Sequence, residues 1–361
     1  MKNKKSKREL PYDEKCKRKK KGIYRIEIID KNNKNNEDNK YKKFFKYFYL
    51  HNNKPISKED QERVDKLGLV PAHTNVWVSI DPKSKIQATG IDSKGRKQYK
   101  YHINHIKKAE EEKFIRLYKF IKKMPYLEDK MERDRTATIL TKNRTISLML
   151  YLVQELNLRV GKEMYAKMNN SYGICSLKKS HAKVEGETLK LSFLAKSKQE
   201  VSYTLKNKYV ADEIKTLKQF NIEDEKLFTY ISPNNNFVHI IDLDLNTYLK
   251  DAMGSNEFSV KDFRTYAANI HFVKALLSET KKRLPLDKLS IKQNINAAQE
   301  YTAYFLRHTK SISKKSYTMS LITDMYQIDP QWFIDNKNKK SLTVLIELLE
   351  IYKENLKNEN V

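Results

Sequence analysis

A histidine and a tyrosine lie nine residues apart near the end of the chain, in the segment RHTKSISKKSY. Lysines and hydroxyl side chains separate His308 from Tyr317. A phenol has a pKa of about 10, so it attacks an electrophile only where its surroundings favour the phenolate. The segment therefore indicates either an ordinary surface tyrosine or a nucleophile in a basic site.

A tyrosine nucleophile in such a site is suited to attack on a phosphodiester. The transition state spreads negative charge over the phosphoryl oxygens, and fixed cations stabilise that charge without a metal. Arginine suits this role because its planar guanidinium binds two phosphate oxygens and stays charged. The leaving alkoxide needs a general acid. The chemistry thus requires a tyrosine, two arginines, a histidine donor and an acid such as lysine.

The chain supplies candidates for each role. Arg159 follows an apolar helix in LNLRVGKE, Arg264 lies in KDFRTYAAN, and Lys196 follows a strand in LAKSK. Each also has a plainer explanation. Taken singly, each plainer explanation is favoured: Arg159 as a helix C-terminal cation, Arg264 as an ion-pair partner of Asp262 or another carboxylate, and Lys196 as an edge lysine. His308 alone is typical of a helix cap. The occurrence of the whole set in this order favours the catalytic interpretation.

The first hundred residues predict a small β-rich region. GIYRIEIID alternates and is β-branched, as expected of a strand. TNVWVSID, KIQATGID and RKQYKYH are three further short runs joined by tight turns, which predicts a meander. Residues 1–20 are mostly basic and polar, as in a solvated tail.

After this region the apolar spacing becomes helical, as in KKAEEEKFIRLYKFIKKM. Residues 171–205 predict three short strands within helical sequence, and helical patterns resume from VKDFRTYAANIHFVKALLSET to LTVLIELLEIYKEN. We expect an α+β fold. Its parts are a basic, disordered tail (1–20), a β-rich N-terminal domain (21–106) and a larger, mainly helical domain with a three-stranded insert (107–361).

Composition limits the partners. The chain has 72 Lys and Arg against 45 Asp and Glu, a formal net charge of +27. This excess indicates a polyanion, with nucleic acid ahead of an anionic membrane. No apolar run approaches the roughly 20 residues of a spanning helix, and MKNKKSKREL is no signal peptide, so we expect neither secretion nor membrane insertion. Two distant cysteines and the lack of a GxxxxGK[ST] segment argue against a disulfide framework, a zinc site and a P-loop.

At this point the sequence resembles the type IB DNA topoisomerases, in the compact form of poxviruses and other large DNA viruses. The resemblance covers roughly residues 65–325 and rests on HTNVWVSIDPKSKIQATGIDSKGRKQYKYH, LRVGKEMY, LSFLAKSK, KDFRTYAAN and RHTKSISKKSY. It implies a catalytic fold shared with tyrosine recombinases. It also implies relaxation of positive and negative supercoils through a 3′-phosphotyrosyl intermediate, strand rotation and resealing, without ATP, required metal or other cofactor.

The resemblance implies a role for each candidate. Tyr317 is the nucleophile, Arg159 and Arg264 stabilise the phosphate, and Lys196 is the general acid toward the 5′-oxygen. His308 donates to a non-bridging oxygen. Two positions depart from the family pattern: Ala195 and Arg307 stand where glycine often precedes the lysine and the histidine. Lys198 is a rival for the acid role.

The resemblance also implies double-stranded DNA as the partner, gripped by a monomeric clamp with the N-terminal domain opposite the catalytic domain. It implies no membrane and no nucleotide, and a location where the DNA is: nucleus, viral factory or virion for a virus, cytoplasm for a bacterium. Strand alternation puts Tyr99 and Tyr101 on one face, although two packing tyrosines fit equally well. The candidate DNA contacts are Arg96, Lys97, Gln98, Tyr99, Tyr101, Lys162, Tyr165, Lys261 and Asn269.

Two other functions fit parts of the pattern. A tyrosine recombinase shares the spacing from histidine to tyrosine, but usually has histidine three residues before the second arginine, where Lys261 stands here. The C-terminal LTVLIELLEIYKENL segment is amphipathic enough for the tetramer contacts of a recombinase, or for packing on its own core. An architectural DNA-binding protein would need only the basic charge.

Overall fold

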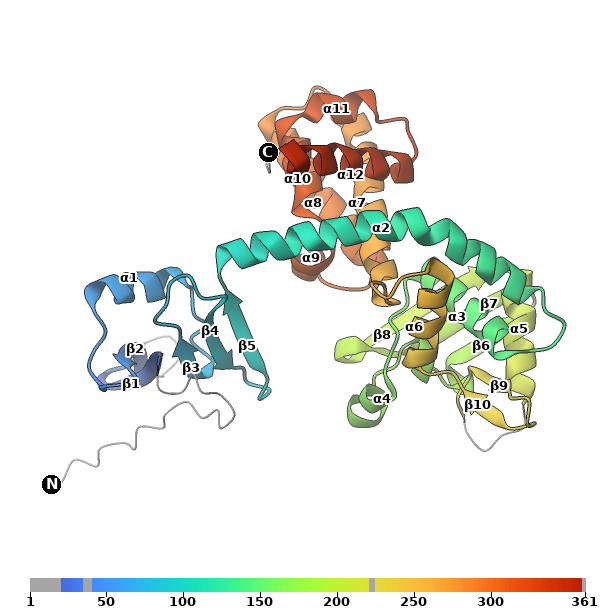
Figure 1. Cartoon of the computed structure of the whole chain (residues 1–361), viewed down its shortest axis with the longest axis horizontal. Coiled ribbons are helices and arrows are strands. Elements are labelled where there is room, and N and C mark those ends of the chain that lie inside the picture. The colour runs from blue at the N-terminus through green and yellow to red at the C-terminus, as the bar shows by residue number, and fades with distance from the viewer. Residues whose placement is uncertain (1–20, 35–40, 221–224, 359–361) are drawn as a thin grey trace. The chain divides into compact units, whose positions relative to one another are not determined.

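The computed structural model of the protein describes residues 21–34, 41–220 and 225–358. The tail expected at residues 1–20 lies outside the described residues. The chain divides into two compact units, Met1–Glu111 and Glu112–Val361. Helices and strands both contribute, with a small β region first, so the expected mixed fold is confirmed at this level (Figure 1).

The first unit contains a five-stranded antiparallel sheet in the order β2-β1-β3-β4-β5. The predicted strands are confirmed, and the aromatic segment after residue 40 adds another. Ile23 of the first strand pairs with Val78 of the third, and both are fully buried. The strands are β1 (Ile23–Lys34), β2 (Tyr41–Tyr49), β3 (Thr74–Val78), β4 (Ile86–Ile91) and β5 (Lys97–Tyr101).

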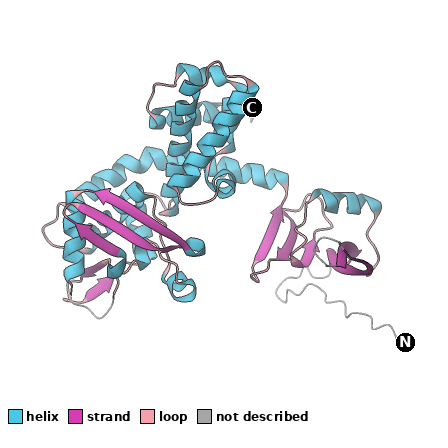
Figure 2. Ribbon diagram, turned by 180° about the vertical axis from the view of Figure 1, so that it is seen from behind, coloured by secondary structure: helices cyan, strands magenta, loops and turns pink. Residues whose placement is uncertain are grey.

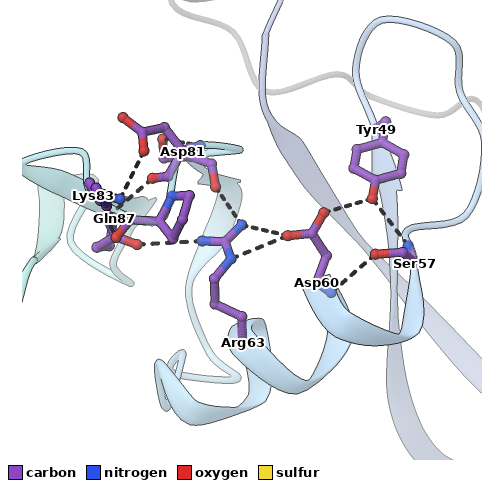
Figure 3. A network of polar contacts seen from close by, with 9 residues as sticks. Tyr49, Ser57, Asp60, Arg63, Asp81, Lys83 and Gln87 are labelled. Carbon is purple, nitrogen blue, oxygen red and sulfur yellow. Dashed lines mark hydrogen bonds and ion pairs between the residues drawn. The ribbon is translucent and has the colours of Figure 1, made fainter.

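One helix of the first unit was not expected from the strand pattern. Helix α1 (Lys58–Lys66) begins after Ser57, whose side chain accepts the N–H of Asp60 at 3.1 Å. Arg63 bonds Asp60 at 2.9 Å and the backbone oxygen of Ser79 at 2.7 Å, which ties the helix to the sheet (Figure 3). Val64 packs into the small core with the buried strand residues.

Helix α2 (Ile103–Arg135) runs on through the boundary expected between residues 106 and 107. Pro125 lies within it. From Phe114 to Met131 one face of the helix is buried in the second unit, and its apolar residues recur mostly at three- and four-residue spacing.

The second unit begins with a lobe around a three-stranded antiparallel sheet, β6-β7-β8, as predicted (Figure 2). Leu189, Leu191 and Phe193 alternate inward along the middle strand. Helix α5 packs on this sheet. The strands are β6 (Ala182–Glu185), β7 (Thr188–Ala195) and β8 (Gln199–Lys206), with a separate pair β9 (Thr229–Ile231) and β10 (Phe237–His239); the helices are α3 (Lys142–Leu156), α4 (Glu163–Asn169), α5 (Lys208–Gln219) and α6 (Asp242–Met253), and the 3-10 turns are Ile174–Ser176, Lys179–His181 and Lys196–Lys198.

Helices form the rest of the second unit. Helix α7 packs against α8, α11 and α12, and the apolar face of α12 is completely buried at Val344, Leu345, Leu348 and Leu349. This face therefore packs on its own core. The elements are α7 (Lys261–Lys282), α8 (Lys288–Phe305), α9 (Lys310–Ile312), a π-helical turn (Ser313–Tyr317), α10 (Ser320–Ile328), α11 (Pro330–Asp335) and α12 (Ser341–Asn358). Within the described ranges, no helix is both long and apolar enough to cross a membrane.

Candidate active site

Four of the five candidate catalytic residues meet in the second unit. The ring of His308 stacks on that of Tyr317 with centroids 4.9 Å apart, and the guanidinium carbon of Arg264 lies 5.4 Å from the Tyr317 centroid. Arg159 lies near enough to Tyr317 for each to affect the other's pKa. The cluster thus joins the segment after α3, the helix α7, the link after α8 and the π-helical turn.

The two arginines are held by backbone carbonyls. Arg264 is 3% exposed, donates to the carbonyl of Leu306 at 2.7 Å, and also donates to that of Asn157. Arg159 donates to the carbonyl of Arg307 at 3.4 Å. In the part of the chain that the structure describes, no carboxylate pairs with either guanidinium. Two adjacent cations without a counter-ion form a site that favours an anion.

Unsatisfied donors point to the same ligand. Arg264 Nε and both ring nitrogens of His308 are buried without a hydrogen-bond partner. Buried polar groups are rarely left unpaired in a native structure, so each indicates a missing partner. A phosphate supplies several acceptor oxygens that such donors can share.

The electrostatics suit a tyrosine nucleophile. Burial raises the pKa of the Tyr317 phenol, but Arg264, Arg159 and Lys261 together outweigh burial, and the pKa falls below its ordinary value. Burial, then Arg264 and Arg159, lower the pKa of His308 to about 4. The imidazole is therefore neutral near pH 7 and can donate from one ring nitrogen. Burial and the neighbouring Arg264 also lower the pKa of Arg159.

The local structure explains how Arg159 is placed. Helix α3 ends at Leu156, and Asn157 adopts the left-handed conformation, with φ 53°. The chain then pairs with a second segment, where Ile174 N–H donates to Arg159 at 2.8 Å and Cys175 N–H donates to Val160 at 2.8 Å. The interpretation of Arg159 as a helix C-terminal cation is therefore wrong.

Two glycines allow this pairing. Gly161 has φ +69°, and a Cβ there would lie 2.3 Å from the backbone nitrogen of Gly173. A Cβ on Gly173 would in turn lie 2.5 Å from the carbonyl oxygen of Arg159. The glycine in RVGKE thus lets two backbones approach behind the arginine.

Arg264 is not in an ion pair with Asp262, and His308 is not in the last turn of a helix. Asp262 instead forms a bidentate pair with Arg116 at 2.8 and 2.5 Å. The helix before His308 ends at Phe305, and His308 follows Arg307, which is left-handed with φ 50°. The ion-pair explanation of Arg264 is therefore wrong. The helix-cap explanation of His308 is confirmed for its backbone, because its N–H donates to the carbonyl of Ala303 at 3.1 Å after the left-handed Arg307.

Asn269 has a different place from the one expected of a DNA contact. It is fully buried, and its amide donates to the carbonyl of Tyr317 at 3.2 Å. Its oxygen accepts the N–H of Met319 at 3.0 Å. A side chain with no exposed surface cannot reach DNA, so Asn269 holds the backbone on both sides of Thr318.

Lys196 is not brought to the cluster. It is exposed in the three-residue turn between β7 and β8, where Ser197 and Lys198 have positive φ. None of the hydrogen bonds or ion pairs among the described residues joins Lys196 or Lys198 to the four clustered side chains. The hairpin geometry therefore does not choose between the two lysines.

The expected DNA contacts of the first unit form a strip along β5 and the residue before it, exposed except at the half-buried Gln98. Tyr99 and Tyr101 stack on each other, with centroids 6.0 Å apart, and are 45% and 40% exposed. Lys97 lies 5.8 Å from the Tyr99 ring, while Arg96 and Gln98 both bond Asp92.

The remaining expected DNA contacts lie in the second unit. Tyr165, on α4, is 49% exposed. Lys162 is exposed and pairs with Asp242 at 3.2 Å. Lys261 is exposed at the start of α7, near enough to Tyr317 to affect its pKa.

Sequence reasoning missed several residues of the site. Asn157 and Leu306 contribute only carbonyls, so no side-chain signal marks them. Tyr203 on β8 lies among Arg264, Arg159 and Arg307, and burial raises its pKa. Arg307 departs from the family pattern, and that departure is the signal that could have found it.

Comparison with known proteins defines the class. Residues 95–334 match the model of the eukaryotic DNA topoisomerase I catalytic core, and residues 44–92 match the N-terminal domain of bacterial DNA topoisomerase IB. The chain belongs to the type IB DNA topoisomerase family. It is 46% identical to DNA topoisomerase 1B of Acanthamoeba polyphaga mimivirus, over 97% of this chain and all of that protein. It is 25% identical to DNA topoisomerase 1B of vaccinia virus (strain Copenhagen), over 74% of this chain and 80% of the relative.

Proposed function

We propose that Tyr317 is the nucleophile with which this topoisomerase cleaves and reseals one strand of duplex DNA. The observation that supports it most strongly is the stacking of Tyr317 on His308 beside two arginines that no described carboxylate neutralises. The phenol oxygen attacks the phosphorus, the bond to the 5′-oxygen breaks, and the tyrosine is left on the 3′-phosphate. Reversal by the free 5′-hydroxyl reseals the strand after the duplex has rotated.

Arg159 and Arg264 stabilise the charge of the transition state in this proposal. Both guanidinia are fixed by carbonyls before DNA arrives, so little reorganisation accompanies the reaction. Neutral His308 donates a hydrogen bond to a non-bridging oxygen. Each step exchanges one phosphodiester for another of similar energy, so neither ATP nor another cofactor is needed.

Lys196 is our proposal for the general acid that protonates the 5′-oxygen. Its place on an exposed turn means that DNA or the hairpin must move it toward the cluster during binding. An acid that arrives only with the substrate limits cleavage to correctly bound DNA. Lys198, two residues further along the same turn, remains the rival.

The two units have distinct roles in the proposal. The β-rich N-terminal domain (21–106) binds DNA through the strip of Arg96, Lys97, Gln98, Tyr99 and Tyr101, and the catalytic domain (107–361) has the tyrosine recombinase and topoisomerase IB fold. In the catalytic domain, Lys162, Tyr165 and Lys261 are the proposed DNA contacts. The protein acts as a monomer around double-stranded DNA, wherever that DNA is located.

A recombinase is the less favoured function. Both matched family models are topoisomerases. The α12 face that would make tetramer contacts is buried in the chain's own core.

Trapping of the covalent intermediate tests the assignment. A duplex labelled on the strand to be cleaved is mixed with protein, and the reaction is stopped with detergent. The wild type and Tyr301→Phe, a nearby tyrosine on α8, should both retain the label, and peptide mapping should place it on Tyr317. Tyr317→Phe should retain none. Label on another residue, or undiminished label on Tyr317→Phe, would refute the assignment.

A further inference from the structure

Arg307 is a bulky residue in a backbone conformation that favours glycine. Its φ is +50°, which crowds the Cβ of any residue that has one. Its backbone has a clear task, since the N–H donates to Tyr304 at 3.2 Å and the carbonyl accepts from Arg159 at 3.4 Å. Glycine or asparagine would do this with less strain. The arginine side chain therefore needs an explanation of its own.

The side chain is held between two aromatic rings. The guanidinium carbon of Arg307 lies 4.9 Å from the Tyr304 centroid and 5.8 Å from the Tyr203 centroid. Among the interactions of the described residues, neither a hydrogen bond nor an ion pair engages this guanidinium. Stacking limits the motion of the group and leaves its edge donors available. Arg307 is thus a pre-positioned cation with unused donors.

Arg307 is also part of the lining of a polar pocket. The pocket has a volume of about 860 Å³, and residues of β7 and β8 form part of its wall. The carbonyl of Arg307 accepts a hydrogen bond from Arg159, so the pocket shares Arg307 with the cluster that forms the proposed phosphate site. Its lining also includes the charged or ionisable residues Lys178, His181 and Glu200.

We infer that Arg307 binds a second phosphate of the DNA, beside the phosphate that Tyr317 attacks. This inference rests on the proposed function and adds a contact outside the five catalytic residues. A duplex at the cluster must continue past it, and a rigid arginine with free donors is suited to a phosphodiester. Arg307 is a positioning residue: it fixes the strand without touching the reacting atoms. Glu200 on β8 also lines the pocket, so its carboxylate keeps the lining from being uniformly cationic.

Salt dependence of DNA binding tests this contact. Binding is measured in the Tyr317→Phe background, so that no cleavage intervenes, at several salt concentrations. Arg307→Asn keeps a residue that tolerates left-handed backbone and removes the charge; Arg307→Lys keeps the charge. Loss of one phosphate contact should reduce the slope of log K against log salt by about 0.9, which is roughly eightfold weaker binding at 0.1 M salt. Arg307→Lys should keep most of the slope.

The outcomes distinguish failure of this inference from failure of the proposed function on which it rests. An unchanged slope in Arg307→Asn, while the wild type relaxes plasmid, overturns the contact alone. A slower cleavage rate with an unchanged slope also overturns it, because the effect would then pass through the backbone to Arg159. If the wild type neither cleaves nor relaxes DNA, the proposed function fails as well.

Discussion

Gly161 lies behind Arg159, one of the two proposed catalytic arginines, and replacing this glycine with alanine should disable cleavage. Its φ is +69°, and the added Cβ would lie 2.3 Å from the nitrogen of Gly173. Because that neighbour is backbone, it cannot rotate aside. The two segments must separate, and the hydrogen bonds of Ile174 to Arg159 and of Cys175 to Val160, both 2.8 Å, are the first to break.

These losses set the expected change in the free energy of unfolding and in the cleavage rate. Two backbone hydrogen bonds contribute about 1 kcal/mol each, and a Cβ in left-handed backbone costs about 1–2 kcal/mol. Gly161→Ala should therefore lower the free energy of unfolding by about 3–4 kcal/mol. Displacement of one pre-positioned donor from a transition state slows a reaction by roughly 10²–10³-fold. We therefore expect Gly161→Ala to cleave DNA roughly 10²–10³-fold more slowly than the wild type.

Gly186→Ala is the matched control. Gly186 also has positive φ, +60°, in the turn between β6 and β7, but a Cβ there meets nothing within 4 Å. The free energy of unfolding of Gly186→Ala should fall only by the cost of a Cβ in left-handed backbone, about 1–2 kcal/mol. The variant should cleave DNA at the wild-type rate. Urea denaturation and single-turnover cleavage of a labelled duplex measure both quantities. If the two variants lose equal stability and both cleave normally, the close approach does not position Arg159.

Three further predictions test other parts of the site. Asn269→Ala leaves buried backbone groups unpaired, so urea denaturation should show a free energy of unfolding about 1–3 kcal/mol lower. The variant should also form the covalent adduct more slowly while its DNA affinity is unchanged. Weakened DNA binding with normal cleavage would contradict this role. The pKa of His308 lies near 4 in the folded chain, below the ordinary 6.5, so from pH 6.5 down to 4 the unfolded chain takes up this proton first and stability falls. His308→Gln should make that fall shallower, and an equally steep fall would contradict the shift. Lys196→Ala should slow cleavage roughly 10²–10⁴-fold when the leaving group is an ordinary 5′-oxygen, but little when it is a 5′-sulfur, which departs without a proton. Lys198→Ala should cleave both substrates at the wild-type rate. If only Lys198→Ala shows the difference between the two substrates, Lys198 is the acid.

The sequence was most informative where local pattern decides structure. The alternation of β1 and β3–β5 and the apolar spacing of α3, α7, α8 and α12 predicted elements that the structure contains. Helix α1 was missed because KEDQERVDK is polar almost throughout and buries only Val64. Its signal was the N-cap pattern of Ser57 and Asp60, which is independent of hydrophobic spacing.

The site was less predictable because carbonyls and left-handed residues build it. Arg264 and Arg159 are oriented by backbone oxygens of Asn157, Leu306 and Arg307, and no residue type marks a carbonyl ligand. Asn269 follows Arg264 in KDFRTYAAN and was expected at the DNA or as a support for Arg264. Its side chain turns inward to the Tyr317 segment, which only the packing of α7 decides.

Relaxation of supercoiled plasmid, in EDTA and without ATP, tests the central claim most directly. The wild type should convert the plasmid to a ladder of relaxed topoisomers and should act on both signs of supercoil. Tyr317→Phe should bind the plasmid with similar affinity and leave it supercoiled. Relaxation by Tyr317→Phe would show that another residue is the nucleophile, and a wild type that relaxes plasmid only with ATP or metal would contradict the arginine-based mechanism.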